Sequence, residues 1–151
     1  MTPLETLNVS LIAGMDPNAW NDEGIAPIHY ASEQGYSDCI APLAAAGAEL
    51  DAKSRYGSTA LHISADYGDF KTLVALIDCG ADVNIEDEDG DIPIMISMGR
   101  GDLDCVEVLL EAGSLPERTA YFDGKPDDKQ QECVDRINAY MEQTVITVVE
   151  A

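Results

Sequence analysis

Glycines recur along this chain at one fixed interval, and that interval is the strongest constraint on its fold. Three separate series share one spacing of 33 residues. They are Gly14, Gly47, Gly80 and Gly113; Gly24, Gly57 and Gly90; and Gly35, Gly68 and Gly101. Three series with one period indicate a structural repeat of that length. In such a protein each unit stacks only on its neighbours, and the units bury one continuous core between them.

Two short phrases recur with the same period. Residues 26–29 read Ala-Pro-Ile-His, and they align with Thr-Ala-Leu-His at 59–62 and Ile-Pro-Ile-Met at 92–95. This phrase resembles the Thr-Pro-Leu-His signature of ankyrin repeats. Residues 46–52 and their counterparts at 79–85 and 13–19 are similar to the ankyrin stretch that ends the second helix and begins the hairpin finger. The resemblance covers roughly residues 4–115.

The resemblance implies an all-α fold, an ankyrin-repeat solenoid of stacked helix-turn-helix units with short hairpin fingers. We expect a right-handed stack with fewer than about a tenth of the residues in strands. Residues 1–151 form one domain in this interpretation. Its parts are an N-terminal cap at 1–20, repeats at about 21–53, 54–86 and 87–119, and a C-terminal capping helix at about 126–148.

Departures from the repeat pattern predict local differences. The third repeat lacks the Thr and His of the signature, which brace the turn in the family, so we expect it to be the less rigid one. Pro42 falls inside a second helix, where it removes a backbone hydrogen bond, and a bent or shifted helix is expected. The β-branched run at 144–149 could continue as helix, turn to strand or dangle. We expect this tail to pack back as a cap, leaving a monomer, rather than to pair two copies.

Charge narrows the class of partner. The chain has 29 acidic and 8 basic residues and a formal net charge of −21. Such a field repels nucleic acid and anionic lipid and attracts basic surfaces, so we expect a basic protein partner and binding to neither nucleic acid nor membrane. Solubility or a salt-loving host would explain the acidity as well. Residues 1–52 contain no Lys or Arg, so no basic leader peptide is expected and a cytoplasmic location is predicted.

No constellation for catalysis, metal binding or a cofactor is expected. His29 and His62 occupy one position in successive repeats, where the resemblance assigns them to hydrogen bonds within the repeat. The acidic run at 82–91 fails as a calcium loop, because with Gly90 in sixth place Ile85 and Ile96 would fill the positions that need Asp and Glu. The four cysteines are too widely spaced for paired zinc motifs, and we expect reduced thiols.

The resemblance places the binding site on a concave surface formed by the finger tips and the exposed side of the first helices. Aromatic residues there would anchor a partner, and carboxylates would steer it. The candidate residues are Trp20, Glu23, Tyr30, Glu33, Tyr56, Asp66, Tyr67, Glu86, Glu88 and Asp89. The alternative is that these aromatics pack on neighbouring fingers while the carboxylates only solvate the surface.

The function that follows is a non-enzymatic protein–protein interaction module that presents an acidic, aromatic concave face to a basic protein. A second hypothesis is a bacterial immunity protein or phage-encoded inhibitor that neutralises a toxin or nuclease. The weakest hypothesis is a metal-binding or enzymatic regulator that uses His29, His62 or the finger carboxylates.

The charge also predicts how stability responds to salt. Repulsion among the carboxylates of a chain with net charge −21 opposes compaction, and added salt screens that repulsion. The melting temperature should therefore rise between low and moderate salt concentration, as measured by circular dichroism. A midpoint that stays flat or falls would show that repulsion is not a significant term.

Overall fold

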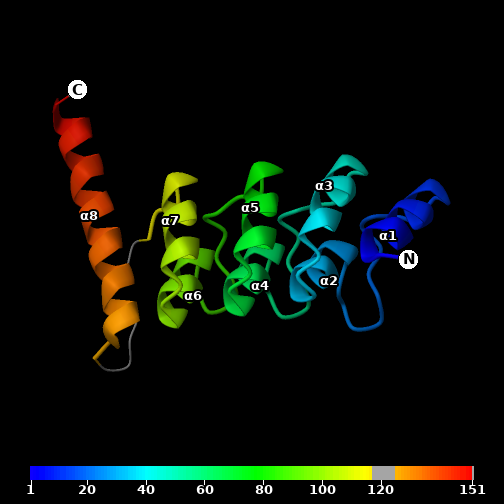
Figure 1. Ribbon diagram of the computed structural model, residues 1–151, viewed down its shortest axis with the longest axis horizontal. Helices are drawn as coiled ribbons and strands as arrows, with labels where there is room; N and C mark the ends of the chain where they lie inside the picture. Colours follow the sequence, from blue (N-terminus) through cyan, green and yellow to red (C-terminus); the bar gives the residue numbers. More distant parts are fainter. Residues whose placement is uncertain (117–124, 151) are drawn as a thin grey trace.

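A computed structural model describes residues 1–116 and 125–150 of the chain, and the described part consists of helices stacked in pairs (Figure 1). No strand occurs in these two stretches. The helices are α1 (Pro3–Ile12), α2 (Pro27–Glu33), α3 (Ser37–Ala45), α4 (Ala60–Tyr67), α5 (Phe70–Asp78), α6 (Pro93–Arg100), α7 (Leu103–Glu111) and α8 (Asp128–Glu150). The expected all-α solenoid is confirmed.

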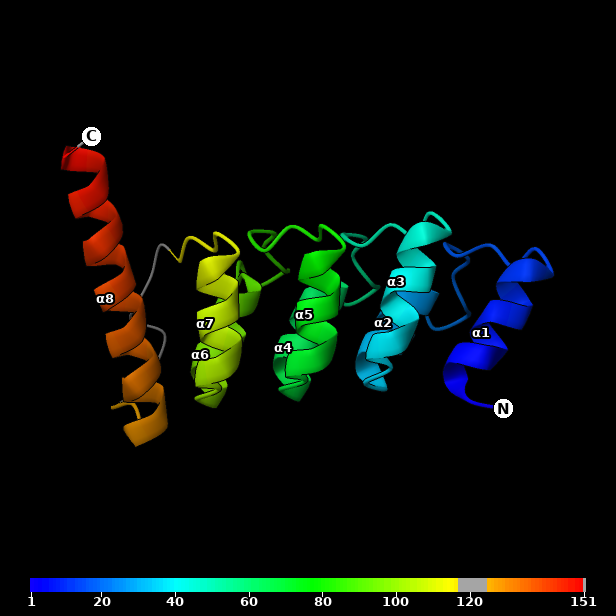
Figure 2. The same ribbon diagram turned by 45° about the horizontal axis from the view of Figure 1, so that its top comes forward.

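The helices lie in two rows. Figure 2 shows α1, α3, α5 and α7 in a front row, and each packs against the next. The second row contains α2, α4 and α6, and these also pack in succession. We call the first set the outer helices and the second set the inner helices. Each repeat contributes one helix to each row, so the core lies between the rows and between successive pairs.

Local sequence signals start and end the inner helices. Pro27 and Pro93 open α2 and α6, at positions where a first helical turn needs no N–H. Gly68 follows α4 in a left-handed conformation, with φ 64°, which a side chain would disfavour. The chain then turns at once into the outer helix of the same repeat, which brings the two helices side by side.

The core repeats with the sequence. Leu43, Leu76 and Leu109 occupy one position of the repeat on α3, α5 and α7, and each is at most 1% exposed. Ile28 and Ile94 are buried to the same extent on the inner helices. The apolar periodicity of the sequence therefore identifies the packed positions correctly.

The finger turns are short. Each is closed by a backbone hydrogen bond across five residues, such as the N–H of Ser54 to the carbonyl of Ser58 at 2.9 Å and that of Asp87 to Asp91 at 2.9 Å. None of them extends into paired strands in the described part of the chain. The low strand content expected from the repeat is confirmed.

The helix that contains Pro42 is not shifted along the chain, so of the two expected distortions, a bend or a shift, the shift is absent. It spans Ser37–Ala45, and α5 of the next repeat spans Phe70–Asp78. Both ends of the two helices are therefore separated by one repeat period. Proline removes the hydrogen bond to the carbonyl four residues earlier, and that residue is Asp38, which is exposed and accessible to water. Burial of the neighbouring core residue Leu43 on the same helix keeps the repeat in register.

The C-terminal helix caps only part of the stack. Along its first half Cys133 and Ile137 are buried as α8 packs against α6 and α7. The helix continues through the β-branched run, and it extends beyond the stack in Figure 1. There Val145 and Val149 are 59% and 79% exposed. No helix of the described stretches is both long and apolar enough to cross a bilayer.

The stacked core predicts a large cost for removing a buried leucine. Leu73 on α5 is fully buried, so Leu73→Ala should lower the free energy of unfolding by about 2–5 kcal/mol through lost burial and a cavity. Ile12→Ala, at a residue 88% exposed, is the matched control and should change stability by less than about 0.5 kcal/mol. Urea denaturation of both variants measures the difference. Equal midpoints would contradict the assignment of Leu73 to a packed core.

Candidate protein-binding face

The fingers and the exposed sides of the inner helices form one surface, which we call the finger face. It comprises the turns at residues 20–25, 53–58 and 86–91 together with the uncovered sides of α2, α4 and α6. Its framework is set by two buried histidines that connect an inner helix to the next finger.

His29 connects α2 to the second finger. Its Nδ1 accepts the N–H of Ala26 at 3.2 Å, which leaves the proton on Nε2, and this N–H donates to the carbonyl of Ala52 at 2.8 Å. Burial lowers the pKa of His29 below its ordinary value near 6.5, and the bond to Ala52 opposes that shift. The side chain is 1% exposed and serves as a structural tie.

His62 repeats this arrangement one unit later. Its Nδ1 accepts the N–H of Thr59 at 3.2 Å and lies 2.8 Å from the Thr59 hydroxyl, and its Nε2 donates to the carbonyl of Asp91 at 2.8 Å. Burial is again the main cause of a lowered pKa. In the third repeat Met95 stands in this position, buried but without a ring nitrogen. The prediction that both histidines serve hydrogen bonds of the repeat is confirmed.

A hollow of about 170 Å³ lies between the first two inner helices and the second finger. It brings together three of the predicted residues, Glu33, Tyr56 and Tyr67. The Tyr67 hydroxyl donates to Oε1 of Glu33 at 3.4 Å, so α2 and α4 are linked across the hollow. Tyr56 and Tyr67 keep 63% and 56% of their surface exposed. The hollow therefore presents two aromatic rings and a carboxylate to solvent.

Trp20 lies beside this hollow. Its ring centroid is 5.5 Å from that of His29, which lines the hollow, and the two planes are tilted by 37°. Half of the Trp20 surface is exposed. Trp20 therefore packs on His29 with part of its ring and remains accessible to a partner with the rest.

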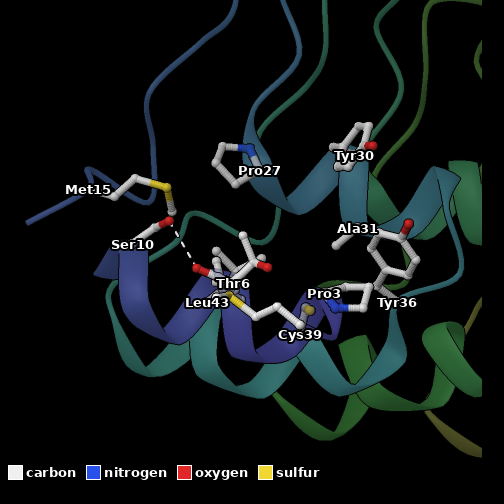
Figure 3. A pocket seen from close by; sticks show the side chains of 12 residues that line it. Pro3, Thr6, Ser10, Met15, Pro27, Tyr30, Ala31, Tyr36, Cys39 and Leu43 are labelled. Carbon is white, nitrogen blue, oxygen red and sulfur yellow. Dashed lines mark hydrogen bonds between the residues drawn. The ribbon is translucent and has the colours of Figure 1, made fainter. Parts of the chain in front are cut away.

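Tyr30 lies elsewhere. It lines a groove at the N-terminal end of the stack, where its ring is 6.2 Å from the ring of Tyr36 in an edge-on arrangement (Figure 3). The structure does not bring Tyr30 into the hollow with Tyr56 and Tyr67. The two surfaces belong to opposite sides of α2.

Cations interrupt the acidity of the finger face. The guanidinium of Arg55 lies 5.0 Å from the centre of the Tyr56 ring and donates to the backbone carbonyl of Glu23 at 3.2 Å. Arg100 forms an ion pair with Asp66 at 3.8 Å. Two predicted residues, Glu23 and Asp66, are therefore contacted by basic side chains of the same face.

The remaining predicted carboxylates belong to the third finger. Glu86, Glu88 and Asp89 are exposed, and none of them pairs with a Lys or Arg among the described residues. The Glu88 side chain lies against Gly57 of the second finger, where an added Cβ would meet it. Successive fingers thus lie side by side, and negative charge concentrates at the third.

Sequence reasoning missed part of the hollow. Besides the residues already named, its wall contains Ile25, Ser54, Ser58 and Ile63. Ile25 directly follows a repeat glycine, and Ser58 holds the same position one repeat later. That repeated position was the available signal, since a residue that follows a turn glycine faces the inner helices.

Among the described residues, few side chains are placed to bind a metal ion or to act as a nucleophile. No group of three or more His, Cys, Asp or Glu side chains lies close enough there to hold a metal. Burial, with help from nearby carboxylates, raises the pKa of Cys105 and of Cys133 to about 11, so both thiols stay protonated at neutral pH. These buried cysteines fit a packing role.

Comparison with known proteins supports the interpretation of the repeat. A family profile described as ankyrin repeats (3 copies) matches residues 3–87. The matched span runs from α1 to the third finger and includes the whole hollow. The chain matches none of the curated proteins.

The histidine ties predict a loss of stability on acidification. Both histidines have a lowered pKa in the folded state, so the unfolded chain binds more protons. Their contribution is complete above about pH 6.5 and declines as pH falls below it, by at most about 1.4 kcal/mol per histidine and pH unit. The difference in unfolding free energy between pH 7.5 and 5.5 should therefore shrink in His29→Met/His62→Met.

The native Met95 is the precedent for that substitution. Protonation of carboxylates is common to parent and variant, so the comparison isolates the histidines. NMR titration of the two imidazoles gives an independent measurement. Two histidines that titrate at or above pH 6.5 would contradict the assignment.

Proposed function

Since this chain belongs to the ankyrin-repeat family, which implies a protein–protein interaction module, we propose that it binds a basic protein through its finger face and catalyses no reaction. The observation that carries the proposal is the hollow beside the second finger. Two tyrosines that are each more than half exposed stand there beside the Glu33 carboxylate. Rings in this state lose their remaining contact with water only when a partner covers them.

The chemistry of the hollow suits an Arg or Lys side chain of a partner. Tyrosine faces attract cations, and a carboxylate within the same hollow supplies a charged acceptor. The chain itself shows the first contact, because Arg55 lies over the Tyr56 ring. A partner arginine between Tyr67 and Glu33 would make the same kind of contact, with an ion pair added.

The third finger supplies attraction at longer range. Its carboxylates are exposed and lack basic partners among the described residues, and the chain has a net charge of −21. Fields of this kind raise the rate of encounter with a cationic surface and add less to the final affinity. We therefore assign anchoring to Trp20, Tyr56 and Tyr67 and steering to Glu86, Glu88 and Asp89.

The partner class is defined by charge alone. A cationic toxin or nuclease belongs to it, as the immunity hypothesis requires, but no feature of the finger face singles out that member of the class. We further propose a monomer in the cytoplasm, a location that agrees with four free cysteine thiols.

Association and dissociation rates separate the two roles. Trp20→Ala and Tyr67→Ala should speed dissociation of a captured partner by about 30-fold, since a hot-spot aromatic contributes about 2 kcal/mol or more. Glu86→Gln/Glu88→Gln/Asp89→Asn should slow association and flatten its dependence on salt. The partner is first identified by cross-linking in the native host. Surface plasmon resonance with the purified partner then measures both rates.

Matched controls lie on the outer helices. Asp78→Asn/Asp104→Asn/Glu111→Gln removes the same charge from exposed positions of α5 and α7, and Phe70→Ala removes an exposed aromatic ring of α5. Both controls should bind more like the parent than the finger variants do. If the finger variants bind as the parent does, the interface lies elsewhere on the molecule.

A further inference from the structure

A second concave feature lies at the N-terminal end of the stack. It is a groove of about 480 Å³ between α1, α2 and α3 (Figure 3). Its lining is mostly apolar and includes Leu7, Met15, Pro27, Tyr36 and Leu43. None of its lining residues belongs to the hollow of the finger face.

The repeat explains why a groove exists at this place. Helix α1 stands in the outer row and packs against α3, as α3 packs against α5. Each of the later outer helices has an inner helix of the same repeat beside it: α2 beside α3, α4 beside α5, and α6 beside α7. Among the described residues α1 has no such partner. The groove is the space that an inner helix of that unit would fill.

The side chains that face this space occupy core positions of the repeat. Thr6, Leu7 and Ser10 stand one repeat period before Cys39, Ile40 and Leu43, which are buried in the next unit. In α1 the same positions are exposed or half-buried, and the helix has no buried residue.

Hydroxyl groups do not make the groove polar. The Thr6 hydroxyl donates to the carbonyl of Thr2 at 3.1 Å, and the Ser10 hydroxyl donates to that of Thr6 at 2.9 Å. Both hydroxyl protons are used within α1, so these side chains turn mainly carbon surface toward the groove. An apolar occupant would leave neither of these two donors unsatisfied.

The part of the chain that forms the groove is acidic. Residues 1–52 contain eight carboxylates and no Lys or Arg. Three of these carboxylates, Glu5, Asp16 and Asp38, adjoin lining residues in the sequence, and all three are exposed. An occupant that is apolar on one side and basic on the other would match both the apolar lining and the negative charge of this part of the chain.

We propose that this groove binds a short amphipathic helix of a partner protein, apolar toward α1 and carrying Lys or Arg on its outward side, in the place that an inner helix of the first unit would occupy. The inner helix α2 has seven residues, so a segment of about two turns is long enough. Such helix-in-groove binding depends on apolar residues spaced three and four apart. The site is separate from the finger face, and the proposal does not depend on finger-face binding.

A second copy of this chain is the less suitable occupant. Each copy has a net charge of −21. Among the described residues, the end of α8 is a helical segment whose apolar side chains Val145, Ile146 and Val149 are exposed. Residues 137–151 contain two carboxylates and no Lys or Arg. Placing that helix against the acidic N-terminal part of another copy would bring like charges together, whereas a basic helix removes the repulsion.

The test uses a fluorescein-labelled synthetic helix of about 14 residues, with Leu spaced three and four apart on one side and Lys elsewhere. Fluorescence anisotropy measures its binding to the full chain. Thr6→Trp fills the groove from an exposed position and should weaken binding at least tenfold. Val9→Trp is the matched control, since Val9 is 58% exposed on α1 but does not line the groove, and it should bind as the parent does.

A charge pair provides a second test of the same site. Ser10→Lys places a cation in the groove and should also weaken binding, whereas Asn8→Lys, at an exposed residue outside the lining, should have a smaller effect. A peptide with Glu in place of Lys should bind at least tenfold more weakly to the parent chain. Circular dichroism melts establish that each variant is folded before its binding is compared.

Three results would overturn the proposal. If the peptide bound equally to all variants, its binding would reflect general attraction to the negatively charged chain and not occupation of the groove. Loss of binding in Tyr67→Ala, with Thr6→Trp unaffected, would place the peptide on the finger face, which refutes the groove and leaves the finger-face proposal standing. Self-association of the chain, measured by sedimentation and abolished by Thr6→Trp, would make a second copy the occupant.

Discussion

Each helix pair of this chain can bury its apolar side only against the neighbouring pair, and the other features of the molecule depend on this constraint. Inside the stack the constraint is met twice, once on each side, and the core positions are nearly inaccessible. At the ends it is met differently. Helix α8 covers both rows through its contacts with α6 and α7, whereas α1 covers the outer row. The two ends of the described stack are therefore covered differently.

Most of the architecture could be predicted from the sequence, because a constant repeat period fixes the phase of every helix. Helices α3, α5 and α7 have bounds related by that period, and even Pro42 does not disturb it. Local propensity was the weaker guide. The penalty of Pro42 is reduced where the lost bond belongs to an exposed residue, and the β-branched run at 144–149 continues a helix that begins in buried contacts.

The candidate site was predictable only in part. Position within the repeat correctly placed Tyr56 and Tyr67 as exposed residues of one face. The period gives no distances between side chains of different repeats, so the Arg55–Tyr56 and Arg100–Asp66 contacts were not foreseen. Tyr30 shows a further limit. The sequence treats it as equivalent to an inner-helix residue of any repeat, but among the described residues no inner helix precedes α2, and on that side the ring borders the groove.

The histidine hydrogen bonds that hold the fingers and the proposed binding surface share residues. This overlap decides which residues can be replaced to test binding without changing stability. His29 supports the second finger through Ala52 and also forms part of the wall of the hollow, with Trp20 packed on its ring. Replacing it would change stability and binding together. Tyr67 depends on one long hydrogen bond to Glu33, so its loss affects the surface while leaving the ties intact. A framework held by buried histidines would let the exposed rings of the proposed binding surface meet a partner without first ordering the fingers, and this would lower the entropic cost of association.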